Sequence, residues 1–483
     1  MAMTAHEPSP TVLIVGGGVA ALEALLALRA TAGELPHVRV LAPDAEFVLR
    51  ASAVLEPFAR GHTRRIPLRA IVESQSAELV PDQLAAVDHD RRVVTTAAGE
   101  ELAYEHLLIA LGAIGAPAFP GAITFGGPQD RDALVEVLAE AQRGEIDSIA
   151  FVVPSGATWP LPLYELALLT RAHLREHDGP DVRIAVVTPE DRPLDVFGAG
   201  ASDDLEQRLQ DDDVELHTLS RARGHADGTL ALEGGGHVHA DRAVSLPRLS
   251  GPAIAGLPHD DLGFIPADDR ARVRGTERIY AAGDCTTFPL KQGGLAAQQA
   301  DAAAQSIAEA IGALSDPQPF TPVLRGLLVT GDEPSYFRAY PGAEREPTSV
   351  AIDAPRPGRR GSAPADVAGH RPLWWPPSKV AGPYLGAWLA RPHEPGGEPV
   401  QIEDREIPET ADPQAATEER EAAMDLALAM ADGEARYSDW RAALRALDAA
   451  EALAGALPTE YVQKRELWQA ELHGESTARF RGN

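Results

Sequence analysis

"TVLIVGGGVAALEALLAL", residues 11–28, decides the fold of this chain. The segment "TVLIV" (11–15) predicts a buried parallel strand, and the residues from Val19 to about Thr31 carry the apolar face of a helix. A second apolar run, "VRVLA" (38–42), predicts the next strand. Strand, turn, helix and strand in this order form a βαβ unit, so the sequence predicts an α/β fold.

The turn in this unit, residues 16–21, reads GGGVAA and satisfies the pattern G-x-G-x-x-A. Gly16 permits the tight turn, Gly18 lets a pyrophosphate approach the backbone, and Ala21 allows the helix to pack closely on the strand. The N-terminus of the helix offers free N–H groups to the phosphates. Glycines also occur in turns for steric reasons alone, so the motif needs support elsewhere. The predicted dinucleotide contacts here are Gly16, Gly18, Val19, Ala20 and Ala21.

Two later segments supply that support. Residues 276–284 read "TERIYAAGD", and residues 107–113 read "LLIALGA". With the glycine turn, these segments resemble the three signatures of the pyridine nucleotide-disulfide oxidoreductase superfamily, which has FAD- and NAD(P)-binding halves. The resemblance spans about residues 10–315. It implies that Asp284 hydrogen-bonds the flavin's ribityl chain and that Gly112 and Gly283 lie close to the FAD.

The end of the second strand departs from the pattern. Dinucleotide folds usually place an acidic residue there to bind the adenosine ribose. This chain has Ala42 at that position, and we include Ala42 among the predicted cofactor contacts. Asp44 and Glu46 follow it and can replace the missing acid, although loop carboxylates are also often merely solvated.

Within the superfamily, the chain most resembles type II NADH:quinone dehydrogenases and sulfide:quinone oxidoreductases. Lys291 and Gly293 fit a K-x-G turn that lies at the flavin in the sulfide enzymes. The helix that follows, with Gly293 and Gly294 at its start, then aims its N-terminus at the flavin pyrimidine. An A-x-x-Q pattern ending at Gln299 matches residues that border the quinone in the NADH dehydrogenases. It equally fits a helix with glutamine on its polar face.

The second nucleotide site is degenerate. "PSGATWPLPLYELA" (154–167) follows a predicted strand where a G-x-G-x-x-G loop would hold the nicotinamide cofactor. Only Gly156 remains, and the prolines at 160 and 162 remove N–H donors. The Pro-x-Tyr-Glu frame resembles that of the sulfide enzymes, with Trp159 in place of a redox cysteine. Trp159 either covers the flavin or a flat substrate, or it plugs the vacated pocket.

Three other residues carry open alternatives. Glu165 falls where the NADH dehydrogenases keep a glutamate beside the nicotinamide, but a solvated or capping carboxylate fits equally. Glu190 ends a strand where an NAD ribose acid would lie, and it also fits ordinary turn chemistry. Cys285 is the chain's one cysteine, so the sulfur relay of the sulfide enzymes is not available and we expect a small packed residue. The predicted catalytic residues are Lys291, Glu165 and Trp159, and no metal ligand is predicted.

Composition limits the partners. The 483 residues carry a formal net charge of −29, which argues against nucleic acid and anionic lipid surfaces. No run approaches a membrane span, so we expect a cytoplasmic protein with a small redox substrate. Trp374, Trp375, Tyr384 and Trp388 are candidates for a substrate entrance or a subunit contact, with core packing as the alternative. The C-terminal helices are candidates for binding a protein partner or a second copy of the chain.

These observations predict two Rossmann-like dinucleotide-binding domains and a C-terminal region ending in a helical extension. We expect the FAD-binding domain at 1–125 and 266–325, the degenerate NAD(P)-like domain at 126–265, a Trp/Pro-rich interface region at 326–400, and an acidic linker with helices at 401–483. The predicted function is an FAD-dependent oxidoreductase, with an NAD(P)H donor less supported than FAD and a quinone-like or other small acceptor. The alternative is a flavin-binding scaffold whose helical tail binds a partner.

Overall fold

The computed structural model describes most of the chain up to residue 339 and parts of the remainder. Of residues 367–369 it describes the backbone alone. Trp374 and Trp375, two of the entrance candidates, lie outside the described residues. The described residues are 10–156, 159–177, 179–331, 334–339, 367–369, 379–380, 382–390, single positions between 428 and 451, and 456–472.

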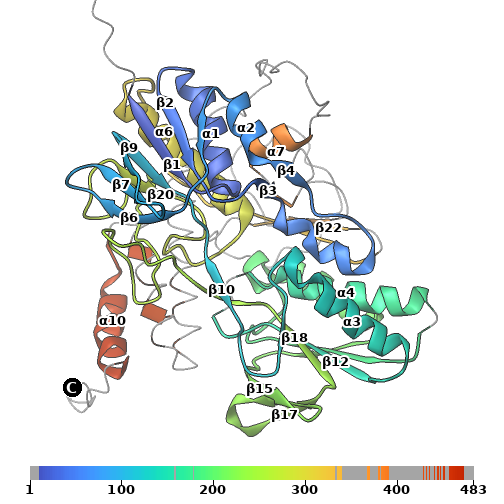
Figure 1. Ribbon diagram of the computed structural model, residues 1–483. Coiled ribbons are helices and arrows are strands. Elements are labelled where there is room, and N and C mark those ends of the chain that lie inside the picture. Colours follow the sequence, from blue (N-terminus) through green and yellow to red (C-terminus); the bar gives the residue numbers. More distant parts are fainter. Residues whose placement is uncertain are drawn as a thin grey trace, which may run out of the picture.

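The first sheet contains the strand that opens the sequence. Its five strands are all parallel and lie in the order β20-β9-β1-β2-β5. Helices α1 (Val19–Ala32) and α6 (Gly293–Ala310) pack side by side against it (Figure 1). The strands are β1 (Thr11–Val15), β2 (His37–Leu41), β5 (Glu78–Val80), β9 (His106–Ile109) and β20 (Ile279–Ala281). Strand β20 therefore returns from far along the chain to the sheet that β1 began.

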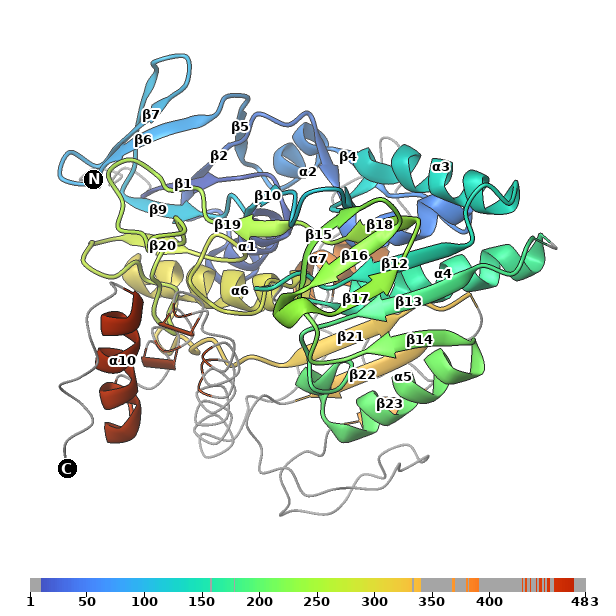
Figure 2. The same ribbon diagram turned by 90° about the horizontal axis from the view of Figure 1, so that it is seen from below.

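The second sheet is also parallel, with the strand order β11-β18-β12-β13-β14. Its strands are β11 (Ile123–Thr124), β12 (Ser148–Val152), β13 (Arg183–Val187), β14 (Val214–His217) and β18 (Arg242–Ser245). Helices α3 (Arg131–Gln142), α4 (Leu161–Glu176) and α5 (Ala199–Asp211) belong to this unit. An antiparallel pair, β10 (Ile114–Ala116) and β19 (Arg248–Ser250), lies between the two sheets (Figure 2).

Smaller elements complete the two units. They are β3 (Glu46–Val48), β4 (Arg65–Pro67), β6 (Leu84–Asp88), β7 (Val93–Thr96), β8 (Glu101–Ala103), β15 (Ala222–Ala226), β16 (Thr229–Leu232), β17 (His237–His239), α2 (Leu68–Ser74), and the 3₁₀ helices Arg50–Phe58, Pro128–Asp130, Asp195–Phe197 and Glu233–Gly235.

The C-terminal part adds a three-stranded sheet and two described helices. Strands β21 (Leu324–Leu328), β22 (Ser335–Ala339) and β23 (Val367–Gly369) pair antiparallel. Helix α7 (Pro383–Ala390) packs on α1, and its Leu385 and Leu389 are buried in the core of the first unit. Helix α10 (Thr459–Leu472) buries Trp468 against other described residues of the tail. In the described residues, no helix is both long and apolar enough to cross a membrane.

The predicted α/β architecture with two parallel sheets is confirmed. Helix α4 begins at Leu161, directly after Pro160 and with Pro162 in its first turn. Proline fits this part of a helix, where its missing N–H costs nothing.

Candidate functional site

The glycine turn after β1 has the geometry of a phosphate-binding loop. Gly16 has φ +130°, and a Cβ there would overlap the carbonyl oxygen of Ala110, directly after β9, so only glycine fits. Gly18 precedes the first residue of α1, and a Cβ built on it would meet no atom within 4 Å. The start of α1 therefore opens onto free space, where its N–H groups can meet an anion.

That space belongs to a cavity of about 580 Å³ between the two units. Its size lies in the range usual for small-molecule and cofactor sites. At one end lies the glycine turn, and at the other lie Trp159, Pro162 and Lys379. The wall is thus built by both parallel-sheet units and by the C-terminal part of the chain.

Most of the predicted cofactor residues line this cavity, and three do not. Ala21 and Ala42 are buried beneath the turn, at 1% and 0% exposure, and Gly294 lies in the first turn of α6. Asp44 and Glu46, the candidates to replace the missing ribose acid, do line the cavity. The predicted residues in the wall are Gly16, Gly18, Val19, Ala20, Gly112, Gly283, Asp284 and Gly293.

Asp284 is half-buried in the cavity wall after β20. Burial raises the pKa of its carboxyl group, while the charges of Lys291 and Arg50 act in the opposite direction. Among the described residues, no group donates a hydrogen bond to this carboxylate. A half-buried carboxylate is unfavourable without a hydrogen-bond donor. Asp284 is therefore suited to accept a hydrogen bond from a hydroxyl group of a ligand.

Lys291 lines the cavity, and its ammonium group is anchored to the backbone. Its Nζ donates to the carbonyl oxygen of Phe288 at 2.7 Å and to that of Thr286, and it lies 4.1 Å from the centroid of the Phe264 ring. The ammonium therefore fixes the turn that follows Asp284 and places a positive charge beside that carboxylate.

The start of α6 is held by two glutamines. Gln292 accepts from the N–H of Leu295 at 2.8 Å and caps the helix. Gln299 is 7% exposed, and its Oε1 accepts from the N–H of Gly283 at 2.7 Å. The A-x-x-Q pattern therefore does not place this glutamine on a solvated face. Gln299 connects α6 to the Gly283–Asp284 turn.

The far end of the cavity combines an aromatic ring and an ammonium group. Trp159 lines the cavity and packs edge-to-face on Phe197, with ring centroids 5.7 Å apart. Lys379 also lines it, and its Nζ pairs with Oε1 of Glu165, which also accepts from the N–H of Val329 at 2.9 Å. Glu165 is fully buried on α4, so it is neither solvated nor in the cavity wall. Burial raises the pKa of Glu165, and Lys379 opposes that shift.

Glu190, the predicted ribose acid of the second nucleotide site, is engaged by the protein. Its Oε2 accepts from the hydroxyls of Tyr164 at 2.5 Å and Thr188 at 2.8 Å, and its Oε1 accepts from the N–H of Leu194 at 3.0 Å. Burial raises the pKa of Glu190 to about 7. The protein therefore already uses three of the roughly four acceptor positions of this carboxylate.

Cys285 is fully buried, and its Sγ donates to the carbonyl oxygens of Ala282 at 3.4 Å and Ile109 at 3.5 Å. Burial raises the pKa of the thiol to about 11. Since the thiolate is the reactive form, this environment fits a packed structural residue.

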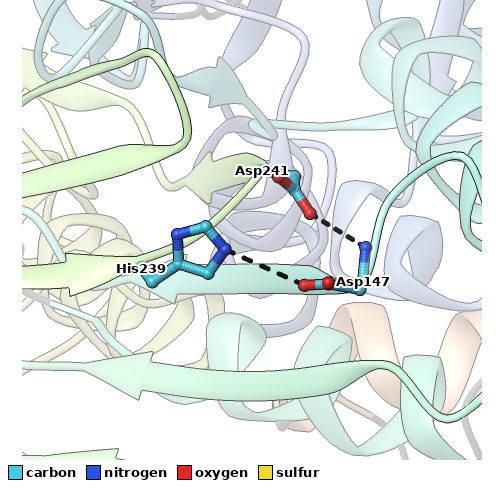
Figure 3. A group of neighbouring side chains, drawn as sticks. All are labelled: Asp147, His239 and Asp241. Atoms are coloured by element: carbon cyan, nitrogen blue, oxygen red, sulfur yellow. Dashed lines mark hydrogen bonds and ion pairs between the residues drawn. The ribbon is translucent and has the colours of Figure 1, made fainter.

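A separate surface group brings together Asp147, His239 and Asp241 (Figure 3). Asp147 and His239 are exposed, and the Asp147 carboxylate pairs with Arg183 at 3.0 Å. The Asp241 carboxylate accepts from the N–H of Asp147 at 2.8 Å and from the Ser148 hydroxyl at 3.0 Å. These hydrogen bonds connect the residues that directly precede β12 and β18. Contacts within the protein therefore explain why the three side chains lie close together.

Sequence reasoning missed three basic residues of the cavity wall: Arg50, Arg325 and Lys379. Arg50 begins a 3₁₀ helix with no motif around it, and Arg325 lies on β21, where alternation alone gave no functional signal. Lys379 comes from the Pro-rich segment before α7. Its position follows from long-range packing, which no local pattern encodes.

The chain is similar to known oxidoreductases in sequence and in fold. An NADH dehydrogenase-like protein of Mycobacterium tuberculosis is 28% identical over 293 residues, which cover 56% of this chain and 72% of that protein. The rubredoxin-NAD(+) reductase of Pseudomonas putida is 26% identical over 291 residues, covering 57% of this chain and 71% of that protein. The sulfide:quinone oxidoreductase of Aquifex aeolicus shares the fold, with a TM-score of 0.62 and 17% identity over 68% of this chain and 83% of that one.

Residues 10–309, more than half of the chain, match the family described as pyridine nucleotide-disulphide oxidoreductase. The matched range contains both parallel sheets, the glycine turn and Asp284. The protein therefore belongs to the pyridine nucleotide-disulphide oxidoreductase family, which confirms the predicted superfamily, the oxidoreductase class and the FAD cofactor.

Proposed function

We propose that this cavity holds FAD with its pyrophosphate at the start of α1 and its reactive ring between the Asp284–Lys291 turn and Trp159, where a small planar substrate exchanges electrons with it. The observation that carries the proposal is the continuity of the cavity from the glycine turn to the Trp159 and Lys379 wall. The flavin, when bound, supplies the hydride or electron transfer, and the protein supplies binding, orientation and charge.

Residues at the first end fit the cofactor. The open space at Gly18 leaves room for phosphate oxygens beside the N–H groups of α1. Arg50 adds a positive charge to the same cavity, and the Asp284 carboxylate offers an acceptor to a hydroxyl group. Each of these residues is proposed to hold FAD directly.

Residues at the second end fit a flat, partly polar substrate. Trp159, Pro162 and Leu327 supply apolar surface, and an indole provides a large stacking area at low entropic cost. Lys379 and Arg325 supply positive charge. This combination favours a planar molecule with carbonyl or anionic oxygens, a class that includes quinones.

The electron donor is the open part of the proposal. Both sequence relatives described above are named for NAD(+) or NADH, so NADH and NADPH are the first donors to test. The engagement of Glu190 by Tyr164, Thr188 and Leu194 makes their binding at the usual ribose position less favourable than in an open site.

The experiment is anaerobic reduction of the FAD-loaded protein. NADH, NADPH, sulfide and a reduced quinone are each added, and the flavin absorption band is followed by stopped flow. Rapid bleaching by one donor, followed by reoxidation with a quinone, supports the oxidoreductase and names the donor. FAD-loaded protein that none of these donors bleaches, and that no added quinone reoxidises after dithionite, contradicts the proposed function and favours a flavin-binding scaffold.

A further inference from the structure

Glu23 is a buried charge in the middle of an apolar helix. It is 0% exposed on α1, between the alanines and leucines that pack on the first sheet and on α6. A buried carboxylate is unfavourable unless hydrogen bonds satisfy it, so its partners indicate what it does.

The partners of Glu23 are at the start of α7. Its Oε1 accepts from the N–H of Tyr384 at 2.8 Å, and its Oε2 accepts from the N–H of Leu385 at 2.7 Å. These N–H groups have no acceptor within their own helix, and a carboxylate also interacts favourably with the positive end of the helix dipole. Glu23 thus caps α7 from a distant part of the sequence.

The surrounding residues are shaped for this contact. A Cβ on Gly382 would overlap Oε2 of Glu23 and lie 3.0 Å from the Cβ of Ala297, so glycine is needed for the close approach. At the other end of α7, Arg64 donates to the carbonyl oxygen of Leu389 at 2.6 Å. Side chains of the first unit therefore hold both ends of α7.

The segment just before α7 forms part of the flavin cavity. Val380 is 2% exposed and lies within 3.2 Å of a Cβ built on Gly293, at the start of α6. Lys379 reaches the Glu165 carboxylate and lines the same wall. Only a few residues separate this wall from the capped N–H groups, so the position of α7 determines where Lys379 lies.

We propose that Glu23 is a positioning residue for the flavin cavity: by capping α7 it seats residues 379–380, and with them the Lys379 ammonium, in the cavity wall. This inference rests on the proposed function of that cavity. It assigns a role to a residue that touches neither end of the proposed site.

Glu23 also contacts a second acid. The carboxyl of Asp301, on α6, hydrogen-bonds Glu23, and burial raises the pKa of both groups, that of Glu23 to about 7. In the described part of the chain, the titratable groups acting on Glu23 are Asp301 from α6 and Tyr384 from α7, and no basic side chain balances them. The N–H groups of Tyr384 and Leu385 lower the pKa of Glu23, so they bind its ionised form more strongly than its protonated form.

The test measures α7 and the flavin separately. Hydrogen exchange of the 383–390 peptide, with mass-spectrometric detection, reports the capping, and the FAD dissociation rate reports the cavity. Glu23→Gln should accelerate exchange in α7 by about tenfold or more, because it removes a charge-assisted cap, and should also accelerate FAD release. Glu309→Gln, at the exposed end of α6, is the matched control and should change neither.

Asp301→Asn separates positioning from general stability. Its amide can donate to Glu23 but cannot ionise, so α7 should keep the protection that Glu23→Gln loses. Unchanged α7 exchange in Glu23→Gln overturns the capping. Faster α7 exchange with unchanged FAD release overturns the positioning role alone. Wild-type protein that takes up no FAD overturns the proposed function, while α7 exchange still reports the cap.

Discussion

Substitution of Gly18 by alanine separates cofactor binding from folding. A Cβ on Gly18 would meet no protein atom within 4 Å, and its φ of −91° is open to any residue. The apoprotein should therefore fold with a free energy of unfolding within about 1 kcal/mol of the wild-type value. The new methyl group projects instead into the space assigned to the FAD phosphates.

The expected loss of affinity follows from the contacts that the methyl group would displace. A hydrogen bond to a charged group contributes about 1.5–3 kcal/mol, and 1.4 kcal/mol corresponds to a tenfold change in Kd. Gly18→Ala should therefore weaken FAD binding by about 10- to 150-fold. Equilibrium titration of the apoprotein with FAD, followed by flavin fluorescence, measures this change, and thermal unfolding of the apoprotein measures the fold.

Gly200→Ala is the matched control, because a Cβ there also meets nothing within 4 Å but lies in α5, outside the cavity wall. It should leave the FAD Kd unchanged. Gly18→Ala protein that binds FAD as tightly as the wild type would refute the placement of the phosphates. Equal loss in both variants would show that general destabilisation, and not the cavity, is responsible.

Four further predictions follow from buried groups. Asp284→Ala should weaken FAD binding by about 10- to 150-fold with little effect on apoprotein unfolding, measured by the same two assays, because no donor within the described protein loses a partner. Cys285→Ala should keep FAD binding and anaerobic reduction, and the wild-type thiol should resist alkylation at neutral pH because its pKa is raised to about 11. Lys379→Met alone should lower the free energy of unfolding in urea by about 3–5 kcal/mol, because it leaves Glu165 buried without a counter-ion. The double variant Glu165→Gln/Lys379→Met should recover most of that stability and still react more slowly with quinone. Burial lowers the pKa of His106 to about 4, so protonation of this residue in the unfolded chain favours unfolding as the pH falls below 6.5. Between pH 6.5 and 4, the free energy of unfolding of the wild type should fall by about 3 kcal/mol more than that of His106→Leu. Equal losses in the two proteins would contradict this prediction.

Local patterns predicted the elements that carry a strong periodicity or a backbone requirement. The run "TVLIV", the glycines at 16 and 18, and the apolar face of α1 specify a βαβ unit because strand, turn and helix each need those residue types. The Gly283–Asp284 turn was found through a resemblance, since one aspartate after a strand has many uses.

Long-range contacts were not predictable in this way. Glu23 is an acid within the largely apolar helix α1, and only the packing of α7 against α1 shows that it caps a distant helix. Glu165 and Lys379 are far apart in sequence, and their pairing depends on how the C-terminal segment returns to α4. Glu190 lies beyond β13, which ends at Val187, and its engagement by Tyr164 depends on how α4 packs against that strand.

The most direct test of the central claim is one anaerobic titration, in which the visible absorption spectrum of the purified protein is recorded after FAD loading and then after each addition of donor and quinone. Our account predicts one FAD per chain, bleaching by a two-electron donor and recovery of the oxidised spectrum with quinone. A protein that takes up no FAD, or whose bound flavin exchanges electrons with none of the donors and with no quinone, contradicts it.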